Sequence, residues 1–229
     1  LYHPKTPVAL VTRVKEELEL RVKSDAAKID FESTSEISPV IVPKPNGGVR
    51  ITGDCPPIND RIPEDAYRMQ SAANFTEVDP HCILFHTFDA YKCFDRTRCS
   101  DRLARLTVFR FPGLPPYSIR SAMQGLKTVP QHVQREFEKL IALCQKELER
   151  HNFRFKMKMN VYIDNFLLQT LCPPGLRARM EEDREIKTLA YHEIQEMILI
   201  TLRTLKKHGN VGFELSKSDF FAESLELFG

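Results

Sequence analysis

The sequence predicts an α+β fold in which antiparallel strands pack against helices. Three stretches carry this prediction. Residues 153–169 alternate apolar and basic side chains with the two-residue period of a strand and then turn back, residues 131–150 repeat apolar side chains at helical spacing, and residues 82–89 form an apolar run of strand length. A strand, a helix and a strand hairpin in this order can form one sheet with a helix packed against it.

The composition is that of a folded, soluble protein. The 229 residues suffice for one large domain or two small ones, and 42% of them are hydrophobic and 28% charged. No apolar run reaches the length of a membrane span, and the N-terminus lacks the apolar stretch of a signal peptide. We therefore expect an intracellular protein, in the cytoplasm or nucleus, with no membrane partner. Because the chain begins at Leu1, we expect it to be a segment of a longer protein.

Cysteine spacing and charge restrict the kind of site. The six cysteines are scattered without a C-x-x-C pair, which predicts reduced thiols and no zinc site. The net charge is only +2, so a site for a polyanion must be a local patch. Residues 92–110 contain such a patch, with only two aspartates against six basic residues: Lys92, Arg96, Arg98, Arg102, Arg105 and Arg110.

The N-terminal third predicts a helix and a hairpin. Residues 11–22 place Val11, Val14, Leu18 and Val22 on one helical face, which we interpret as a packing face. Residues 38–54 read as two strands joined by Asn-Gly-Gly, with Lys44 and Arg50 on either side of the turn. Two interpretations stay open for these cations: ordinary solvation of a hairpin, or a flap that holds a polyphosphate.

The next stretch leads to a carboxylate at the end of a strand. Residues 56–80 are rich in proline and predict an irregular connection with one short helix around 66–73. The strand 82–89 ends in Asp89, which could cap a following helix or bind a ligand. Phe94 follows five residues later, within reach of whatever Asp89 binds.

A loop and a long amphipathic helix follow. Gln124 and the open backbone of Gly125 can lie against a flat ligand, and Pro130 suits the start of a helix. The helix 131–150 is predicted to bury one face, made by Val133, Phe137, Leu140, Ile141, Cys144 and Leu148.

The hairpin 153–169 is predicted to hold a second carboxylate at its tip. Tyr162 and Ile163 continue the first strand, Asp164-Asn165 is a turn-favouring pair, and the return strand starts at Phe166. The pair could serve the turn alone. After a charged stretch, 172–188, a helix should bury Ile186, Leu189, Ile194, Met197, Ile198, Leu202 and Leu205, and residues 213–215 and 225–228 read as closing strands.

Asp89 and Asp164 could meet on adjacent strands of this layer. Two carboxylates make a hard, oxygen-rich site of the kind that Mg²⁺ prefers when it bridges substrate phosphates. Two such ions can hold the attacking and leaving oxygens of an in-line phosphoryl transfer. The predicted flap and basic patch would suit a nucleotide and a polynucleotide.

Five segments, in this order, resemble the reverse transcriptases of gypsy-type LTR retrotransposons, and the resemblance covers nearly the whole chain. They are SPVIVPKPNGGVRI (38–51), FHTFDAYKCF (85–94), AMQGLKTVP (122–130) followed by Gln134, YIDN (162–165) and ELSKSDFFAESLELFG (214–229).

The resemblance implies a role for each matched residue. Asp89, the carbonyl of Ala90 and Asp164 would bind Mg²⁺ or Mn²⁺, helped by Asn165. Lys44 and Arg50 would contact the triphosphate, Phe94 would exclude a 2′-hydroxyl, and Gln124 and Gly125 would pack on the nucleotide. The residues expected at the primer terminus are Tyr162, Phe228 and Gly229.

The resemblance also implies the fold, the partners and the activity. It implies the fingers and palm of a right-hand polymerase, with an antiparallel palm sheet packed on helices. The thumb that is usual in the family has no counterpart in this sequence. The expected segments are 1–88 for the N-terminal helix and fingers, 89–170 for the catalytic core, and 171–229 for an inserted charged segment, a palm helix and closing strands. The implied activity is RNA-directed DNA synthesis from deoxynucleoside triphosphates on an RNA or DNA template-primer. A separate interpretation is a subunit whose thumb is supplied by a second copy of the chain or by a protein partner.

Two departures from the family keep an alternative open. Asn165 replaces the family's second aspartate, which removes one negative charge that would face the cations. Residues 172–188 look like an insertion. The alternative is a weakened or inactive reverse-transcriptase-like module, a diverged or host-adopted copy that binds nucleic acid or protein without catalysis.

Overall fold

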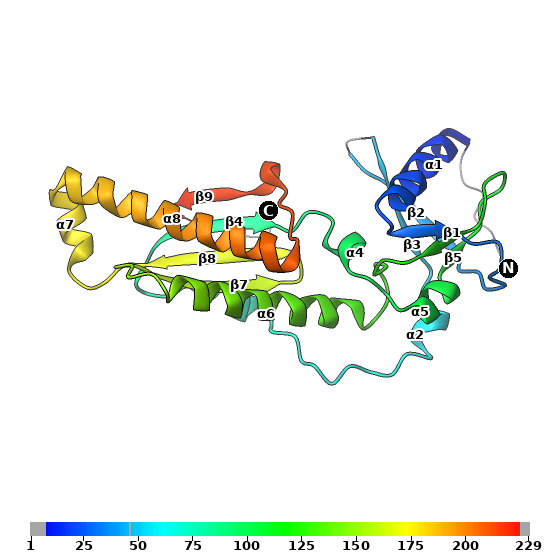
Figure 1. Cartoon of the computed structure of the whole chain (residues 1–229), viewed down its shortest axis with the longest axis horizontal. Coiled ribbons are helices and arrows are strands. Elements are labelled where there is room, and N and C mark those ends of the chain that lie inside the picture. The colour runs from blue at the N-terminus through cyan, green and yellow to red at the C-terminus, as the bar shows by residue number, and fades with distance from the viewer. Residues whose placement is uncertain (1–7, 46, 225–229) are drawn as a thin grey trace. The chain divides into compact units, whose positions relative to one another are not determined.

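A computed structural model describes residues 8–45 and 47–224, and it confirms the α+β prediction (Figure 1). The helices are α1 (Val8–Lys23), α2 (Pro56–Asn59), α3 (Ala72–Phe75), α4 (Cys93–Arg96), α5 (Asp101–Leu106), α6 (Val129–Leu148), α7 (Leu176–Glu182), α8 (Arg184–Gly209) and the 3-10 helix η1 (Leu215–Lys217). The strands are β1 (Ala27–Ile29), β2 (Pro39–Pro43), β3 (Val49–Gly53), β4 (Cys82–Asp89), β5 (Val108–Phe109), β6 (Tyr117–Ile119), β7 (Lys156–Tyr162), β8 (Asn165–Leu171) and β9 (Asp219–Ala222).

The chain forms two compact units, each built from two separate stretches. Unit 1 comprises Leu1–Ala66 and Phe94–Pro130, and unit 2 comprises Tyr67–Cys93 and Gln131–Gly229. The three consecutive segments expected from the sequence, 1–88, 89–170 and 171–229, follow motifs along the chain and stay a prediction. In the described part of the chain, no helix is both long enough and apolar enough to cross a membrane.

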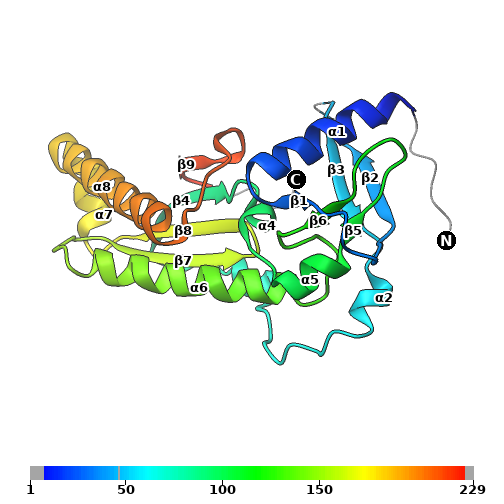
Figure 2. The ribbon, with the colours of Figure 1, turned by 45° about the vertical axis from the view of Figure 1, so that its right-hand side comes forward.

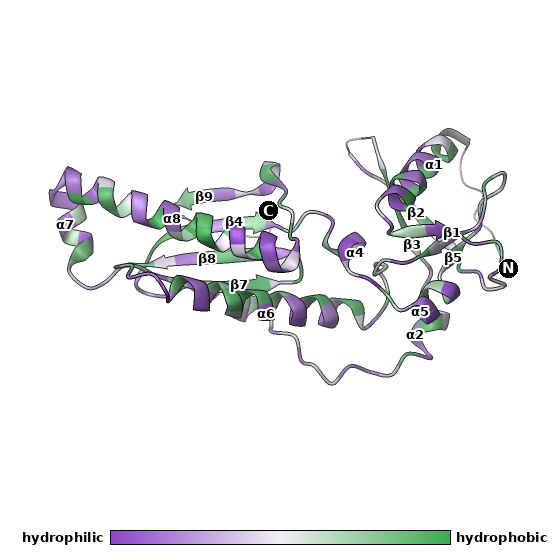
Figure 3. Ribbon diagram, viewed as in Figure 1, coloured by the Kyte–Doolittle hydropathy of each residue, from purple (hydrophilic) through white to green (hydrophobic). Residues whose placement is uncertain are grey.

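Unit 2 is built on a four-stranded antiparallel sheet with the order β7-β8-β4-β9. One face of the sheet packs against α6 and α8, since the ring of Phe137 in α6 lies 5.1 Å from that of Phe166 in β8. Thr201 of α8 lies against the Met157 sulfur of β7 at 3.9 Å. Both Figure 1 and Figure 2 show α6 running alongside this sheet, and Figure 3 shows the alternating hydrophilic and hydrophobic bands of an amphipathic helix along it.

The opposite face of the sheet is covered by the irregular stretch around α3. Phe75 is 1% exposed and packs with Phe85 and Leu167. The fully buried amide of Gln169 donates to the Glu77 carbonyl and accepts from the Asp79 N–H, both at 2.8 Å. The expected helix around 66–73 is wrong, because α3 begins only at Ala72, where the Ser71 hydroxyl caps the N–H of Asn74.

Unit 1 contains the three-stranded antiparallel sheet β1-β6-β5 and the antiparallel hairpin β2-β3. The hairpin predicted from Asn-Gly-Gly is confirmed, with Val42 paired to Arg50. Helix α1 buries Val14 and Leu18 completely, but Val22 is 36% exposed, contrary to the sequence prediction. Arg21 takes the buried place instead, because its guanidinium can donate to the Ile51 carbonyl at 3.2 Å and pair with Glu17.

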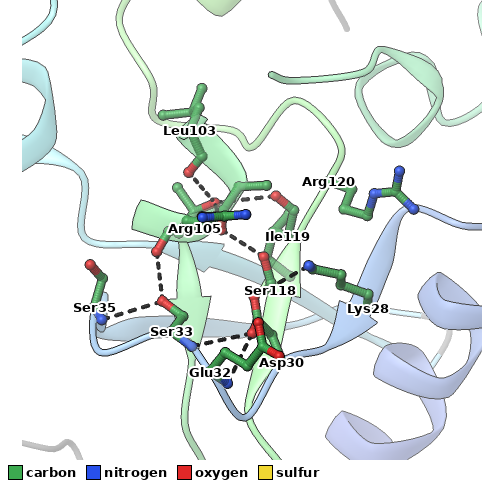
Figure 4. A network of polar contacts seen from close by, with 12 residues as sticks. Lys28, Asp30, Glu32, Ser33, Ser35, Leu103, Arg105, Ser118, Ile119 and Arg120 are labelled. Atoms are coloured by element: carbon green, nitrogen blue, oxygen red, sulfur yellow. Dashed lines mark hydrogen bonds and ion pairs between the residues drawn. The ribbon is translucent and has the colours of Figure 1, made fainter. Parts of the chain in front are cut away.

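A polar network holds the end of β1 against α5 and β6 within unit 1 (Figure 4). Asp30 accepts from the N–H groups of Glu32 and Ser33, each at 3.2 Å, and pairs with Lys28 at 3.5 Å. Burial by itself would raise the pKa of Asp30, but these hydrogen bonds and Lys28 outweigh it and lower the pKa. The Ser33 hydroxyl then donates to the Arg105 carbonyl at 2.8 Å.

Several boundaries differ from the sequence prediction. The strand expected from 153 starts at Lys156, because the N–H groups of Arg154 and Phe155 donate to the Glu193 carboxylate instead. Helix α8 buries Ile194, Met197, Ile198 and Leu205 as predicted, but Leu189 is 53% exposed and Ala190 is buried in its place.

The C-terminal region also departs from the expectation. The strand expected at 213–215 is wrong: Phe213 makes a single bridge to Ala90, η1 follows, and the closing strand is β9. Residues 172–188, read as an insertion, form α7 and the first turn of α8. The strand expected at 225–228 lies outside the described residues.

Candidate active site

The turn of the β7-β8 hairpin is one residue away from its predicted place. Tyr162 pairs directly with Asn165, so the two turn residues are Ile163 and Asp164, and Asn165 is the first residue of β8. Ile163 has a φ of +58°, which is an unusual backbone conformation for a β-branched residue. A two-residue hairpin turn needs a positive φ at its first position to match the strand twist.

The hairpin turn meets the end of β4. Asp89, the last residue of β4, pairs with Asn165 in the antiparallel register, so both side chains lie on the same face of the sheet. The next N–H, that of Ala90, donates to the Asp164 carbonyl at 2.8 Å. The structure therefore brings Asp89, Ala90, Asp164 and Asn165 together at one end of the unit 2 sheet, although their catalytic role stays a prediction.

Two nitrogen groups lie against the two carboxylates. The Lys217 ammonium is 3.1 Å from the Asp89 Oδ2 atom, and the Asn165 Nδ2 donates to the Asp164 Oδ1 at 3.2 Å. Sequence reasoning missed Lys217. The chain around it is held in place because the Glu214 N–H donates to the Asp89 carbonyl at 3.0 Å and the Tyr91 N–H to the Gly212 carbonyl at 2.8 Å.

The oxygen donors suit a hard cation that keeps most of its water. Among the described residues, no group of three or more histidine, cysteine, aspartate or glutamate side chains comes together in a way that could hold a metal ion. Mg²⁺ is commonly bound through only one or two carboxylates, with water and substrate phosphates completing its shell. Asp89 and Asp164 supply such a pair, so the donor set fits an ion shared with a substrate.

Tyr162 and Gln134 support the hairpin from opposite faces of the sheet. Tyr162 packs on Phe75, with ring centroids 6.0 Å apart. Gln134 of α6 is fully buried and bonds to the backbone of the turn. The sequence had suggested a place for Gln134 beside the nucleotide-packing motif but did not indicate this contact.

The residues predicted to bind the nucleotide, Lys44, Arg50, Phe94, Gln124 and Gly125, belong to unit 1. Lys44 directly follows β2, where its N–H donates to the Gly48 carbonyl at 2.8 Å, and Arg50 is exposed on β3. Phe94 lies half-buried in α4. Phe228 and Gly229, expected at the primer terminus, lie outside the described residues.

The loop of Gln124 and Gly125 is fixed to the hairpin and to α2 within unit 1. The Gln124 carbonyl accepts from the Thr52 hydroxyl, and the Gly125 carbonyl accepts from the Asn59 Nδ2 at 2.8 Å. Gly125 has a φ of +103°, and a Cβ there would lie 3.2 Å from the Cys55 sulfur. Both residues remain exposed, so the loop presents its backbone to solvent in a defined conformation.

Part of the predicted basic patch is used in structural contacts. Arg98 pairs with Asp25 at 2.9 Å, and Arg110 donates to the Ser33 carbonyl at 2.6 Å. Arg102 and Arg105 on α5 are exposed. The cationic surface available for a polyanion is therefore smaller than the sequence run suggested.

Burial raises the pKa of five of the six cysteine thiols, those of Cys55, Cys82, Cys99, Cys144 and Cys172. All six are free thiols. Burial raises the pKa of Cys144 to about 12 and, with the Asp54 charge as a smaller cause, that of Cys55 to about 11. Both thiols therefore stay protonated at neutral pH, a form that is a poor nucleophile.

Comparison with known proteins identifies the fold. No protein-family model and no curated protein matches the sequence. The whole chain matches the structure of a foamy viral protease-reverse transcriptase in complex with double-stranded DNA, with a TM-score of 0.76 and 14% identity. The native prototype foamy virus protease-reverse transcriptase matches 95% of the chain, with a TM-score of 0.69 and 19% identity.

The chain has a reverse-transcriptase-like fold. It spans 35% of the first of these proteins and 25% of the second. At 14% and 19% identity the likeness concerns the fold alone.

Proposed function

We propose that this chain is the fingers and palm of a reverse transcriptase related to those of gypsy-type retrotransposons. It would extend a primer with deoxynucleoside triphosphates on an RNA or DNA template. The observation that carries the proposal is the hydrogen bond from the Ala90 N–H to the Asp164 carbonyl, at 2.8 Å, beside the pairing of Asp89 with Asn165. Together they support two carboxylates acting at the same reacting phosphate.

In this proposal, Asp89 and Asp164 hold divalent cations, with the Ala90 carbonyl and the Asn165 amide oxygen as neutral ligands. Bound Mg²⁺ would supply charge stabilisation to the attacking and leaving oxygens of the phosphoryl transfer. The Asp89 side chain is 23% exposed, and its Oδ2 atom lies 3.1 Å from the Lys217 ammonium.

Unit 1 keeps the roles that the resemblance implies. Lys44 and Arg50 would bind the triphosphate, Phe94 would exclude a ribose 2′-hydroxyl, and Gln124 and Gly125 would pack on the nucleotide. The fixed backbone of the Gly125 loop supports such packing, because a rigid surface loses little entropy when a flat ligand binds. A partner chain or a second copy would supply the thumb.

Primer extension on a short RNA template, with Mg²⁺ or Mn²⁺, tests the proposal. We expect extension by the unaltered chain, none by Asp89→Asn, and faster extension by Asn165→Asp. Asp219→Asn is the matched control, because Asp219 is an exposed aspartate of the same sheet at the start of β9. If extension by the unaltered chain were insensitive to Asp89→Asn, the proposed chemistry would be wrong.

A second candidate function is a binding module without catalysis. The specific observation that favours it is a pair of nitrogen groups: the Lys217 ammonium lies against one oxygen of Asp89, and the Asn165 amide donates to one oxygen of Asp164. A binding module would retain its affinity for a primer-template duplex in Asp89→Asn and show no extension in any variant, including Asn165→Asp assayed with a thumb-containing partner.

A further inference from the structure

We propose that Gln134 is a positioning residue, which holds the Ile163-Asp164 turn in the conformation that presents Asp164 beside Asp89. The inference rests on the proposed function for its consequence, cation binding. Gln134 itself is far too buried to touch a substrate, with 0% of its surface exposed. It acts through the backbone of the hairpin.

Gln134 makes hydrogen bonds to two backbone groups at the start of the turn. Its Oε1 accepts from the Ile163 N–H at 2.8 Å, and its Nε2 donates to the Val161 carbonyl, also at 2.8 Å. These are the backbone groups on either side of Tyr162, at the point where β7 gives way to the turn. One side chain from α6 thus ties down the peptide units that enter the turn.

The orientation of the Gln134 amide is dictated by a third contact. Nε2 also donates to the Glu138 Oε1 at 2.9 Å, and the Tyr67 hydroxyl donates to the same carboxylate at 2.5 Å. A carboxylate only accepts hydrogen bonds, so the NH₂ group must face Glu138 and the oxygen must face Ile163. Burial, and then the hydrogen bond to Glu138, raise the pKa of Tyr67 to about 12, which keeps its hydroxyl a donor at neutral pH.

The turn needs external support because its first residue is poorly suited to it. Ile163 has a φ of +58°, where the Cβ of a β-branched residue is crowded and glycine is preferred. Strained residues persist where their surroundings over-determine them. In this conformation of the turn the Asp164 carbonyl accepts from the Ala90 N–H at 2.8 Å. We therefore expect a relaxed Ile163 to move Asp164 away from Asp89.

A purely structural role would be the simpler interpretation of a buried glutamine, and the chain offers a matched control for it. Gln169 is also 0% exposed and also makes two hydrogen bonds to backbone groups, at 2.8 Å each. It lies in β8 four residues beyond Asn165, which is about 13 Å along the strand. Gln169→Met should therefore destabilise the same unit without disturbing the turn.

The test measures Mn²⁺ binding by the full chain, from the electron paramagnetic resonance signal of free Mn²⁺. We expect Gln134→Met to weaken binding about tenfold, as is typical of groups that orient metal ligands, and Gln169→Met to change it less than twofold. Both variants should lower the melting temperature by similar amounts. Equal Mn²⁺ affinities in the two variants would overturn the positioning role.

A rescue variant tests the mechanism directly. In the Gln134→Met background, Ile163→Gly removes the crowding at positive φ and should restore most of the Mn²⁺ affinity, although it adds no contact. If both variants fold but the double variant binds Mn²⁺ no better than Gln134→Met alone, Gln134 does not act through the strain at Ile163.

Hydrogen exchange separates this inference from the proposed function. Exchange of the Ala90 amide, which is bonded to the Asp164 carbonyl, should accelerate in Gln134→Met and not in Gln169→Met, whether or not a metal is present. If the unaltered chain bound no Mn²⁺, the proposed function would be wrong. The exchange rate of the Ala90 amide would still test the positioning role, because its measurement needs no metal. Unchanged Ala90 exchange in Gln134→Met would overturn the positioning role alone.

Discussion

Replacing Lys217 with methionine should tighten the binding of Mn²⁺ to the site formed by Asp89 and Asp164. The Lys217 ammonium lies 3.1 Å from the Asp89 Oδ2 atom, so a divalent cation must displace it before it can use that oxygen. Methionine keeps most of the apolar stem and removes the charge. The affinity should rise because the competing cation is gone.

The size of the effect follows from the exposure of the ion pair. The Asp89 side chain is 23% exposed and that of Lys217 is 67% exposed, so solvent screens most of their attraction. Ion pairs of this kind contribute about 0.2–1 kcal/mol. The upper part of that range corresponds to about a two- to fivefold gain in affinity. The gain should shrink at high ionic strength, because the Debye length falls to about 3 Å at about 1 M salt.

The assay is titration of the full chain with Mn²⁺ at low and high salt, with free Mn²⁺ read from its paramagnetic resonance. Lys139→Met is the matched control, since Lys139 is 68% exposed and pairs with Glu136 on the surface of α6. It should leave the affinity unchanged. A Lys217→Met variant that binds Mn²⁺ no better than the unaltered chain at low salt would refute the competition argument.

Three further outcomes are expected. Asn165→Asp should raise the Mn²⁺ affinity on the order of tenfold, measured in the same titration, because it adds a negative charge next to the site. Burial lowers the pKa of His86 to about 4, below its unfolded value of about 6.5. The contribution of His86 to the free energy of unfolding is therefore fully present above pH 6.5 and falls by up to about 3 kcal/mol toward pH 4. Urea unfolding at the two pH values should show this loss, and the loss should be smaller in His86→Gln. Phe166→Ala should cost about 3–5 kcal/mol in urea unfolding because Phe166 is 1% exposed, whereas Phe31→Ala, at a side chain that is 76% exposed, should cost less than about 0.5 kcal/mol.

The hydrophobic pattern predicted the main elements of unit 2. The strand 82–89 matches β4 residue for residue, and the helix expected at 131–150 differs from α6 by two residues at each end. Both have a long, regular apolar period that local propensity supports. The helix expected at 66–73 failed because that stretch lacks such a period and takes its structure from contacts with other elements: the Tyr67 hydroxyl donates to Glu138 of α6, and the Gln70 amide donates to the Val161 carbonyl of β7.

The hairpin shows where local reasoning loses accuracy. Asp164-Asn165 has the composition of a turn, yet the turn is Ile163-Asp164. Isoleucine at positive φ is unfavourable locally, and the buried Gln134 amide, 29 residues earlier in the chain, stabilises it. No sequence rule for turns could have found this, because the stabilising group comes from another element.

The sequence by itself determined the class of the fold and the identity of the two candidate carboxylates. Period-2 and period-3.6 patterns specify strands and helices through burial, and the order of five motifs indicated a polymerase-like chain. Only the tertiary structure decided which groups surround those carboxylates. The approach of Lys217 to Asp89 and the Ala90–Asp164 hydrogen bond join residues more than seventy positions apart, and such contacts arise from strand register and packing, which no local pattern encodes.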